Sequence, residues 1–206
     1  MQAITDLIMY FHKGGLVMWP LLACSITVIA IAIERFIYYK SVDSGAAFAS
    51  HYCAAVRSGD FAVATELARK GSGQCAQMLA DVAAVAGGKA ENSAFLESRA
   101  GIFMATLRDK LDYLGIIVTM SPLLGLLGTI VGMIGAFSIF NVEAGAPMAI
   151  TGGIGEALIA TATGLCVAIL SLCAHSYFAH RMDNMITDME QCFSALLEAE
   201  TRRGRS

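Results

Sequence analysis

The sequence predicts an all-α integral membrane protein with three transmembrane helices, and three observations support this fold class. The chain has 206 residues, of which 56% are hydrophobic and 15% charged, and its mean hydropathy is +0.63, as is typical of membrane proteins. Three windows are long enough to cross the hydrocarbon core, which takes roughly 20 apolar residues. No strand pattern occurs. The windows are residues 16–33 and 114–140, which carry no charge, and 154–178, where Glu156 is the one charged residue.

The chain begins with two apolar segments of different kinds. Residues 1–13 place apolar side chains at helical spacing, which indicates an amphipathic segment on the outer membrane surface, with a frayed terminus as the alternative. The first transmembrane helix is expected at residues 14–38. Its apolar run is longer than that of a signal peptide, and Glu34 and Arg35 follow it in place of a cleavage site. We therefore expect an uncleaved anchor.

The remaining elements follow from composition and spacing. Residues 39–111 are rich in Ala, Glu, Arg and Lys and are interrupted by glycine-containing turns, which predicts a small helical domain and not a long loop. The second transmembrane helix is expected at residues 112–140 and the third at 151–178, joined by an outer loop at 141–150. Apolar residues then recur at three- and four-residue steps, which predicts that the third helix runs on as a helical tail at 179–206. Its apolar face needs a partner, either the 41–111 region or a neighbouring copy.

The distribution of basic residues predicts an N-out/C-in orientation, because Lys and Arg in short loops favour the cytoplasmic side. Basic residues flank residues 39–111 and also follow the third window, whereas the loop at 141–150 has none. The domain at 39–111 and the tail at 179–206 are therefore expected to be long cytoplasmic extensions of the transmembrane helices.

Cysteine usage and charge argue against several other classes of protein. The six cysteines contain no C-x-x-C pair, so we expect free thiols that pack as small apolar groups, with no disulfide, metal or cofactor. A net charge of −3 without a dense basic run gives no signal for nucleic-acid binding. The spans lack paired aspartates, a Ser-His set or metal ligands, which disfavours an intramembrane protease and predicts that the chain is not an enzyme. A solute carrier is disfavoured because inverted repeats are absent.

Small residues form a continuous stripe along each of the last two transmembrane helices. Such stripes allow close backbone approach between helices in a membrane, where hydrophobic burial gives no drive for pairing. They predict tight packing, either within one bundle or between subunits. The stripe in the second helix consists of Ser121, Gly125, Gly128, Gly132 and Gly135, and the stripe in the third includes Ala157, Thr161, Gly164, Ala168, Ser171 and His175.

Polar side chains beside these stripes predict a hydrophilic lining. A charged Glu156 facing mid-membrane lipid would cost about 2.5–3.5 kcal/mol, so it is expected to face protein or water. The alternative is an N-terminal stabiliser of the third helix, since the helix dipole favours a carboxylate there. Thr129, Thr161 and Thr163 lie near the same faces. For each threonine, a hydrogen bond to a carbonyl of its own helix is the competing interpretation.

Three stretches resemble the ExbB/TolQ/MotA proton-channel family. They are "GGLVMWPLLACSITVIAIAIERF" (14–36), "SPLLGLLGTIVGMIGAF" (121–137) and "GIGEALIATATGLCVAI" (153–169). The resemblance covers all three spans in order. Within the family, the chain most resembles ExbB, a biopolymer transport protein. It implies a homopentamer in the bacterial inner membrane that encloses an ExbD- or TolR-type single-span partner, whose membrane aspartate carries protons. The proton motive force would then drive a TonB-like or TolA-like protein.

By motif position, the resemblance implies a pore threonine at Thr129, the pore glutamate at Glu156 and a second pore threonine at Thr161. Thr163 lies on the same polar flank of the helix. Glu34 and Arg35 match the family's "ER" pair at the inner end of the first span, as interfacial or inter-subunit charges. Because adjacent residues on a helix point about 100° apart, we expect them not to pair with each other.

Two departures and several alternatives remain. Leu170 stands where the family usually has a proline, and His175 stands where a tyrosine is common. A MotA-type stator would need a fourth span, so an ExbB-type subunit that couples the proton motive force to TonB-dependent outer-membrane transport is preferred. The alternatives are a TolQ-type subunit of a Tol-Pal system and a non-conducting membrane scaffold.

Overall fold

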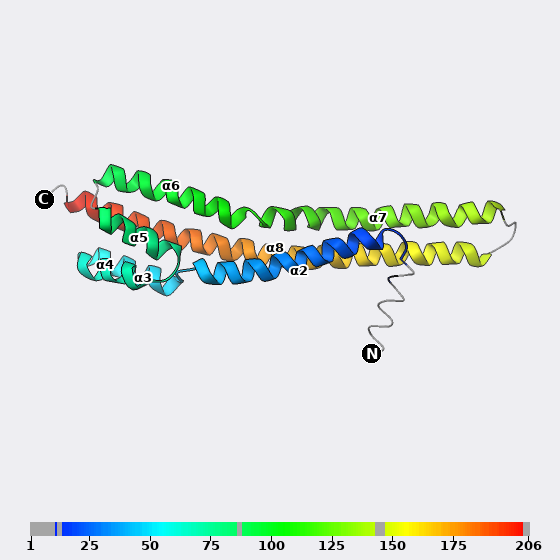
Figure 1. The fold of residues 1–206 in the computed structure, drawn as a ribbon, viewed down its shortest axis with the longest axis horizontal. Coiled ribbons are helices and arrows are strands. Elements are labelled where there is room, and N and C mark those ends of the chain that lie inside the picture. The colour runs from blue at the N-terminus through cyan, green and yellow to red at the C-terminus, as the bar shows by residue number, and fades with distance from the viewer. Residues whose placement is uncertain (1–10, 12–13, 86–87, 143–146, 204–206) are drawn as a thin grey trace, which may run out of the picture. The chain divides into compact units, whose positions relative to one another are not determined.

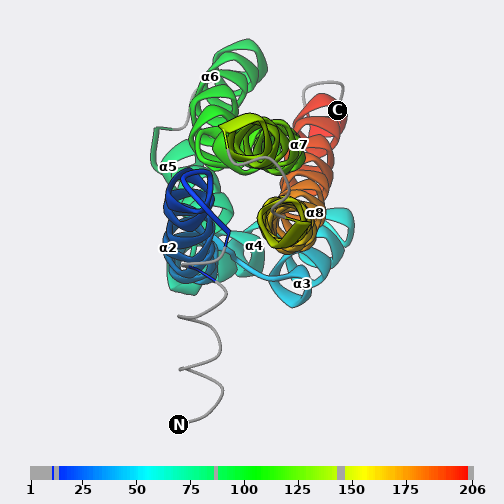
Figure 2. The ribbon, with the colours of Figure 1, turned by 90° about the vertical axis from the view of Figure 1, so that its right-hand side faces the viewer.

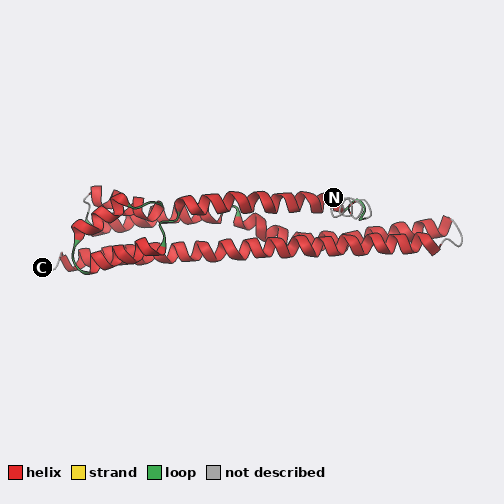
Figure 3. Ribbon diagram, turned by 90° about the horizontal axis from the view of Figure 1, so that it is seen from below, coloured by secondary structure: helices red, strands yellow, loops and turns green. Residues whose placement is uncertain are grey.

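The computed structural model describes residue 11 and residues 14–85, 88–142 and 147–203. All regular structure in this part of the chain is helical, which confirms the predicted all-α class (Figure 3). Three of the helical stretches are long and apolar enough to cross a membrane, which confirms the three predicted spans. The described helices are α2 (Met18–Val42), α3 (Ala46–Arg57), α4 (Phe61–Lys70), α5 (Gln74–Val85), α6 (Lys89–Arg108), α7 (Leu111–Val142) and α8 (Pro147–Arg203), as labelled in Figure 1.

The observed helix ends differ in detail from the segments expected from the sequence. The third span and the tail are one helix of 57 residues, α8, which confirms the prediction that the third helix runs on into the tail. Helix α7 runs to Val142 and α8 begins at Pro147, so helices occupy both ends of the expected outer loop. Apart from Phe11, the expected amphipathic segment at residues 1–13 lies outside the described residues.

The chain divides into two compact units. The span unit comprises Met1–Ile33 and Asp112–Ser176, and the domain unit comprises Glu34–Leu111 and Tyr177–Ser206. Within the span unit, the apolar parts of α2, α7 and α8 lie alongside one another (Figures 1 and 2). Their outward faces carry many exposed large apolar side chains, such as Ile29 and Leu123. Lipid is the solvent for such a surface, so this exposure is expected of helices that span a membrane.

The domain unit has its own apolar core. Its turns occur where glycine interrupts the helical pattern: Gly59 and Gly73 have positive φ, and the Asp60 carboxylate accepts a hydrogen bond from the Val63 N–H as the N-cap of α4. The apolar face of the α8 tail, with Met189 at 1% exposure, is buried in this unit. The partner that this face was expected to need is thus provided by the chain itself.

The six cysteines are free thiols. Cys53, Cys75 and Cys192 are buried in the domain unit, where the Cys53 and Cys192 sulfur atoms lie 4.0 Å apart. Cys166 and Cys173 are exposed on the span unit, on faces that would meet lipid or another membrane helix. Among the described residues, no group of three His, Cys, Asp or Glu side chains could hold a metal ion.

Candidate functional site

Helices α7 and α8 approach so closely in the span unit that backbone meets backbone. A Cβ added at Gly164 would lie 2.6 Å from the Ser121 carbonyl oxygen. A Cβ at Gly125 would lie 3.1 Å from the Cα of Thr161. Both distances are shorter than ordinary van der Waals contact, so only glycine fits at these positions without movement of a helix.

The same contact continues toward the end of α7. A Cβ at Gly128 would meet the Ala160 side chain at 2.5 Å, and one at Gly132 would meet the Gly153 carbonyl oxygen at 3.0 Å. At Gly135 the pattern changes, because nothing lies within 4 Å of the added Cβ. The small-residue stripe of α7 therefore packs against α8 of the same chain along most of its length and is open at Gly135.

The Thr161 hydroxyl lies in this helix–helix contact. Its oxygen is 3.1 Å from the Ala157 carbonyl of its own helix and 3.1 Å from the Gly125 carbonyl of α7. A hydroxyl has one proton to donate, so the two acceptors share it. Thr161 is thus the one described pore candidate whose hydroxyl reaches across to a second helix.

Thr129 and Thr163 make local contacts. The Thr129 hydroxyl donates to the Leu126 carbonyl at 2.6 Å, and the Thr163 hydroxyl donates to the Ile159 carbonyl at 2.9 Å. These are the own-helix hydrogen bonds that compete with a pore role for a membrane threonine. In the described part of the chain, no hydrogen bond joins Thr129, Thr161, Thr163 and Glu156 to one another.

Glu156 lies beside the turn that precedes α2. Its carboxylate occupies the place where a Cβ of residue 15 would be, and Gly15 has a φ of +70°. Position 15 is therefore restricted to glycine by backbone conformation and by space. Glu156 is half-buried, and no described residue forms a hydrogen bond or ion pair with its carboxylate. The two adjacent glycines, Gly14 and Gly15, indicate a turn in the sequence. The contact between Gly15 and Glu156 could not be predicted from the sequence.

The opposite end of the α7–α8 contact involves the positions that depart from the family pattern. The buried Ser171 hydroxyl donates to the Leu114 carbonyl at 2.9 Å. His175 is half-buried, and its Nε2 lies 3.7 Å from the place of a Cβ on Gly115. Leu170 is exposed and lines an apolar groove of about 240 Å³ between α2 and α8. Helix α8 is uninterrupted at this residue.

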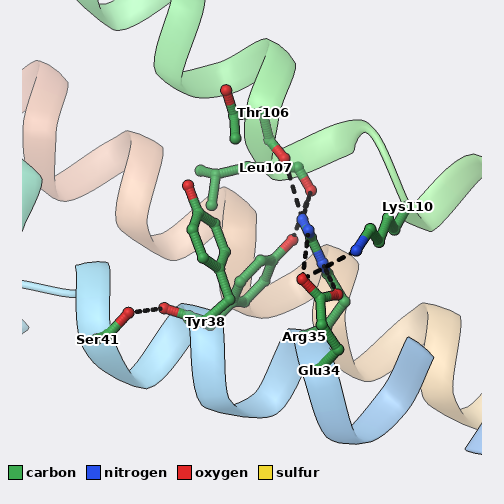
Figure 4. Close-up of polar contacts among 8 residues, drawn as sticks. Glu34, Arg35, Tyr38, Ser41, Thr106, Leu107 and Lys110 are labelled. Carbon is green, nitrogen blue, oxygen red and sulfur yellow. Dashed lines mark hydrogen bonds and ion pairs between the residues drawn. The ribbon is translucent and has the colours of Figure 1, made fainter. Parts of the chain in front are cut away.

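Glu34 and Arg35 belong to the domain unit and form one polar cluster (Figure 4). The Arg35 Nε and one terminal nitrogen donate to the two Glu34 carboxylate oxygens at 2.9 and 3.1 Å. The expectation that these neighbours would not pair is wrong. The angle of 100° applies to the Cα–Cβ bonds, whereas the long, flexible side chains bend toward each other and meet as a bidentate pair. The Lys110 ammonium forms a second ion pair with Glu34 at 3.1 Å.

The same guanidinium also reaches the backbone of α6. Arg35, which is 3% exposed, donates to the Thr106 carbonyl at 3.0 Å and approaches the Leu107 carbonyl at 3.4 Å. The Tyr39 hydroxyl, one turn further along α2, donates to the Leu107 carbonyl at 3.0 Å. Sequence reasoning assigned Arg35 to an interface and missed these carbonyl acceptors. Every residue has a backbone carbonyl, so the sequence does not show which carbonyls at the end of a helix accept hydrogen bonds from a distant arginine.

Sequence comparison relates the chain to known proteins. The family model described as "MotA/TolQ/ExbB proton channel family" matches residues 68–191. A biopolymer transport protein named ExbB-like 3 from Synechocystis sp. is 31% identical over 77% of this chain and 78% of its own length. The biopolymer transport protein exbB1 of Vibrio cholerae is 28% identical over 85% and 80%, respectively. The Tol-Pal system protein TolQ of Pseudomonas aeruginosa is 36% identical over 39% and 35%.

The family match spans more than half of the chain and includes the α7–α8 contact with Thr161 and Glu156. Two of these relatives are named biopolymer transport proteins, and the three apolar helices make this chain a multi-pass membrane protein. The chain belongs to the MotA/TolQ/ExbB proton channel family.

Proposed function

We propose that this chain is the multi-span subunit of a proton-driven envelope motor and that protons pass along the face of α8 that carries Glu156 and Thr161. One observation carries the proposal: a half-buried carboxylate in an apolar span lacks a hydrogen-bond or ion-pair partner among the described residues. An ionised carboxylate in a span normally faces protein or a water-filled path. Glu156 therefore needs water or a second polypeptide beside it.

The pore residues take different roles in this proposal. Thr161 supplies a hydroxyl that exchanges acceptors between α8 and α7, because it already lies 3.1 Å from a carbonyl on each. Glu156 attracts protons electrostatically near the start of the span. Thr129 and Thr163 hold water at the wall when their own-helix hydrogen bonds open.

The conducting state requires other polypeptides. The three apolar windows contain no aspartate, so the titrating carboxylate would come from an ExbD- or TolR-type single-span partner. Gly135, Gly152 and Gly155 have open space where a Cβ would be. These positions could therefore accept a closely packed neighbouring helix. This supports a homo-oligomer, which we propose is a pentamer, with the N-terminus outside and the C-terminus inside the bacterial inner membrane.

We favour the TonB-coupled machine over the Tol-Pal machine as the system that this chain energises. Two ExbB-named relatives match over 77% and 85% of the chain, whereas the TolQ relative matches over 39% of it. Complementation of bacteria that lack either the ExbB-type or the TolQ-type subunit distinguishes the two. Growth that depends on TonB-coupled uptake would be restored in the first case, and resistance to detergent in the second.

Proton flux into liposomes tests conduction directly. The chain is reconstituted with and without an ExbD-type partner, and internal pH is followed after a potential is imposed. We expect partner-dependent flux in the wild type, at least a tenfold loss in Thr161→Val, and a clear loss in Glu156→Gln. Thr119→Val is the matched control, because the Thr119 hydroxyl also bonds to its own helix, at 2.9 Å, but lies on an exposed face.

The control variant separates the pore from general helix effects. Equal flux in Thr161→Val and Thr119→Val would contradict the proposed path along α8. Intact oligomers that conduct no protons in the presence or absence of the partner would favour the non-conducting scaffold.

A further inference from the structure

The junction between α6 and α7 is a helix break without a helix-breaking residue. Helix α6 ends at Arg108 and α7 begins at Leu111, with a turn at residues 109–110 (Figures 1 and 4). Residues 105–114 contain no glycine or proline. Sharp breaks in helices arise at Pro, at Gly or Ser pairs, at π-bulges, or where a side chain inserts into the backbone ladder. The local sequence favours a continuous helix, so the cause of the break must lie elsewhere.

The carbonyl groups at the break identify that cause. In a continuous helix, the Thr106 carbonyl would accept from the Lys110 N–H, and the Leu107 carbonyl would accept from the Leu111 N–H. The ladder is intact one residue earlier, since the Asp109 N–H donates to the Ala105 carbonyl at 3.0 Å. The next of these bonds, from the Lys110 N–H to the Thr106 carbonyl, is not made in this described stretch of the chain.

Two side chains of α2 donate to the carbonyls at the break, and Arg35 takes the place of the missing Lys110 donor. Arg35 donates to the Thr106 carbonyl at 3.0 Å, and Tyr39 donates to the Leu107 carbonyl at 3.0 Å. Tyr39 is fully buried and Arg35 nearly so. Glu34 holds the guanidinium in a bidentate pair and also holds the Lys110 ammonium. The contacts thus secure the residue that would otherwise donate the missing backbone bond.

We infer that Arg35 and Tyr39 form a clamp on a two-state helix joint between α6 and α7. In the clamped state the two carbonyls accept from α2. In the released state the Thr106 carbonyl accepts from the Lys110 N–H, and α6 continues into α7 as one helix. Each state satisfies the Thr106 carbonyl, so exchange between the states replaces one hydrogen bond to it with another. This near-balance is what allows a local rearrangement to be reversible.

The joint adjoins the division between the two units of the chain, since Leu111 ends one part of the domain unit and Asp112 begins part of the span unit. The clamp concerns the backbone of this chain alone. It goes beyond the proposed conduction and does not depend on it.

Hydrogen–deuterium exchange of the full chain in nanodiscs tests the clamp. Electron-transfer fragmentation of the peptide over residues 105–112 resolves single amides. In the wild type we expect rapid exchange at Lys110, whose N–H does not bond to the Thr106 carbonyl. In Arg35→Met we expect the Lys110 amide to exchange about two- to tenfold more slowly, because it regains the Thr106 carbonyl.

The sign of this change distinguishes a clamp from a merely structural contact. A contact that only stabilises the junction would give faster exchange when it is removed. Unchanged or faster exchange at Lys110 in Arg35→Met, with the other helices still protected, would overturn the inference. Lys40→Gln is the matched control, since it removes a positive charge from an exposed position of the same helix and should leave exchange at Lys110 unchanged.

Tyr39→Phe provides a second test that keeps the packing of the ring. It removes only the hydroxyl that donates to the Leu107 carbonyl, so it weakens the clamped state, and the expected effect is slower exchange at Lys110. This variant decides the matter if Arg35→Met does not fold, because slower exchange at Lys110 supports the clamp and unchanged or faster exchange contradicts it. Because the readout is amide exchange, failure of the clamp is distinguishable from failure of proton conduction.

Discussion

Gly164→Ala is the sharpest perturbation of the α7–α8 contact. The added methyl carbon would lie 2.6 Å from the Ser121 carbonyl oxygen and 3.0 Å from the Gly125 Cα. Both are backbone atoms of α7, which no rotamer change can move. To restore ordinary contact near 3.4 Å, the helices must separate locally by about 0.8 Å. Overpacking of this kind typically costs about 1–3 kcal/mol.

Gly135→Ala is the matched control, because Gly135 lies in the same stripe and has nothing within 4 Å of the added carbon. Both variants gain the helix propensity of alanine over glycine, which is at most about 1 kcal/mol. That contribution cancels in the comparison. Gly164→Ala should therefore be less stable than Gly135→Ala by about 1–3 kcal/mol, or roughly 2–12 °C in melting temperature.

Circular dichroism of the detergent-solubilised protein measures the two melting temperatures, and native mass spectrometry measures the oligomer. If Gly135 packs against another copy, Gly135→Ala weakens the oligomer and leaves the melting of the subunit unchanged. Equal melting temperatures for the two variants would refute the close α7–α8 contact.

Two further predictions concern a turn and a thiol. Gly15→Ala should lower both stability and proton flux, because the new methyl group would occupy the position of the Glu156 carboxylate. The control Gly45→Ala meets open space at a similar φ of +81° and should cost only about 1–2 kcal/mol of backbone strain. Melting temperature and proton flux are measured for both variants, and equal losses would contradict the prediction. Burial raises the pKa of the Cys53 thiol to about 11, while the unfolded thiol ionises near its ordinary pKa of about 8.5. Its contribution to stability is therefore fully present below about pH 8.5 and is lost as the pH rises toward 11. Denaturation of wild type and Cys53→Ala across this pH range checks the prediction, because the difference between their free energies of unfolding should depend on pH.

The three spans could be predicted because hydropathy reports the solvent of a helix directly. Windows that are apolar on all sides have no stable place except lipid or a large core, and this chain has three of them. The turns of the domain unit were also visible, since Gly59 and Gly73 interrupt helical patterns where positive φ is needed. Helix continuity was predictable as well, because nothing at residues 178–179 forces a break, and α8 continues from the span into the tail.

The candidate site was predictable in its residues but not in their partners. The spacing of Gly125, Gly128 and Gly132 requires a close neighbour, yet spacing alone does not say whether that neighbour is the same chain or another. In the structure it is α8 of the same chain, and Gly135 is left open. The pairing of Glu34 with Arg35 was predicted wrongly because helical angles describe where side chains start and not where long side chains end.

The threonine hydroxyls show why residue type alone is a weak guide to a proton path. Thr129, Thr161 and Thr163 all bond to a carbonyl of their own helix. Such a hydroxyl must give up a hydrogen bond before it can relay a proton or orient water, and in apolar surroundings an unmade bond is costly. Thr161 is different because a second carbonyl, that of Gly125, lies at the same distance on α7. It can therefore change acceptors without passing through an unbonded state, and this ability comes from the glycine contact that brings the two helices together.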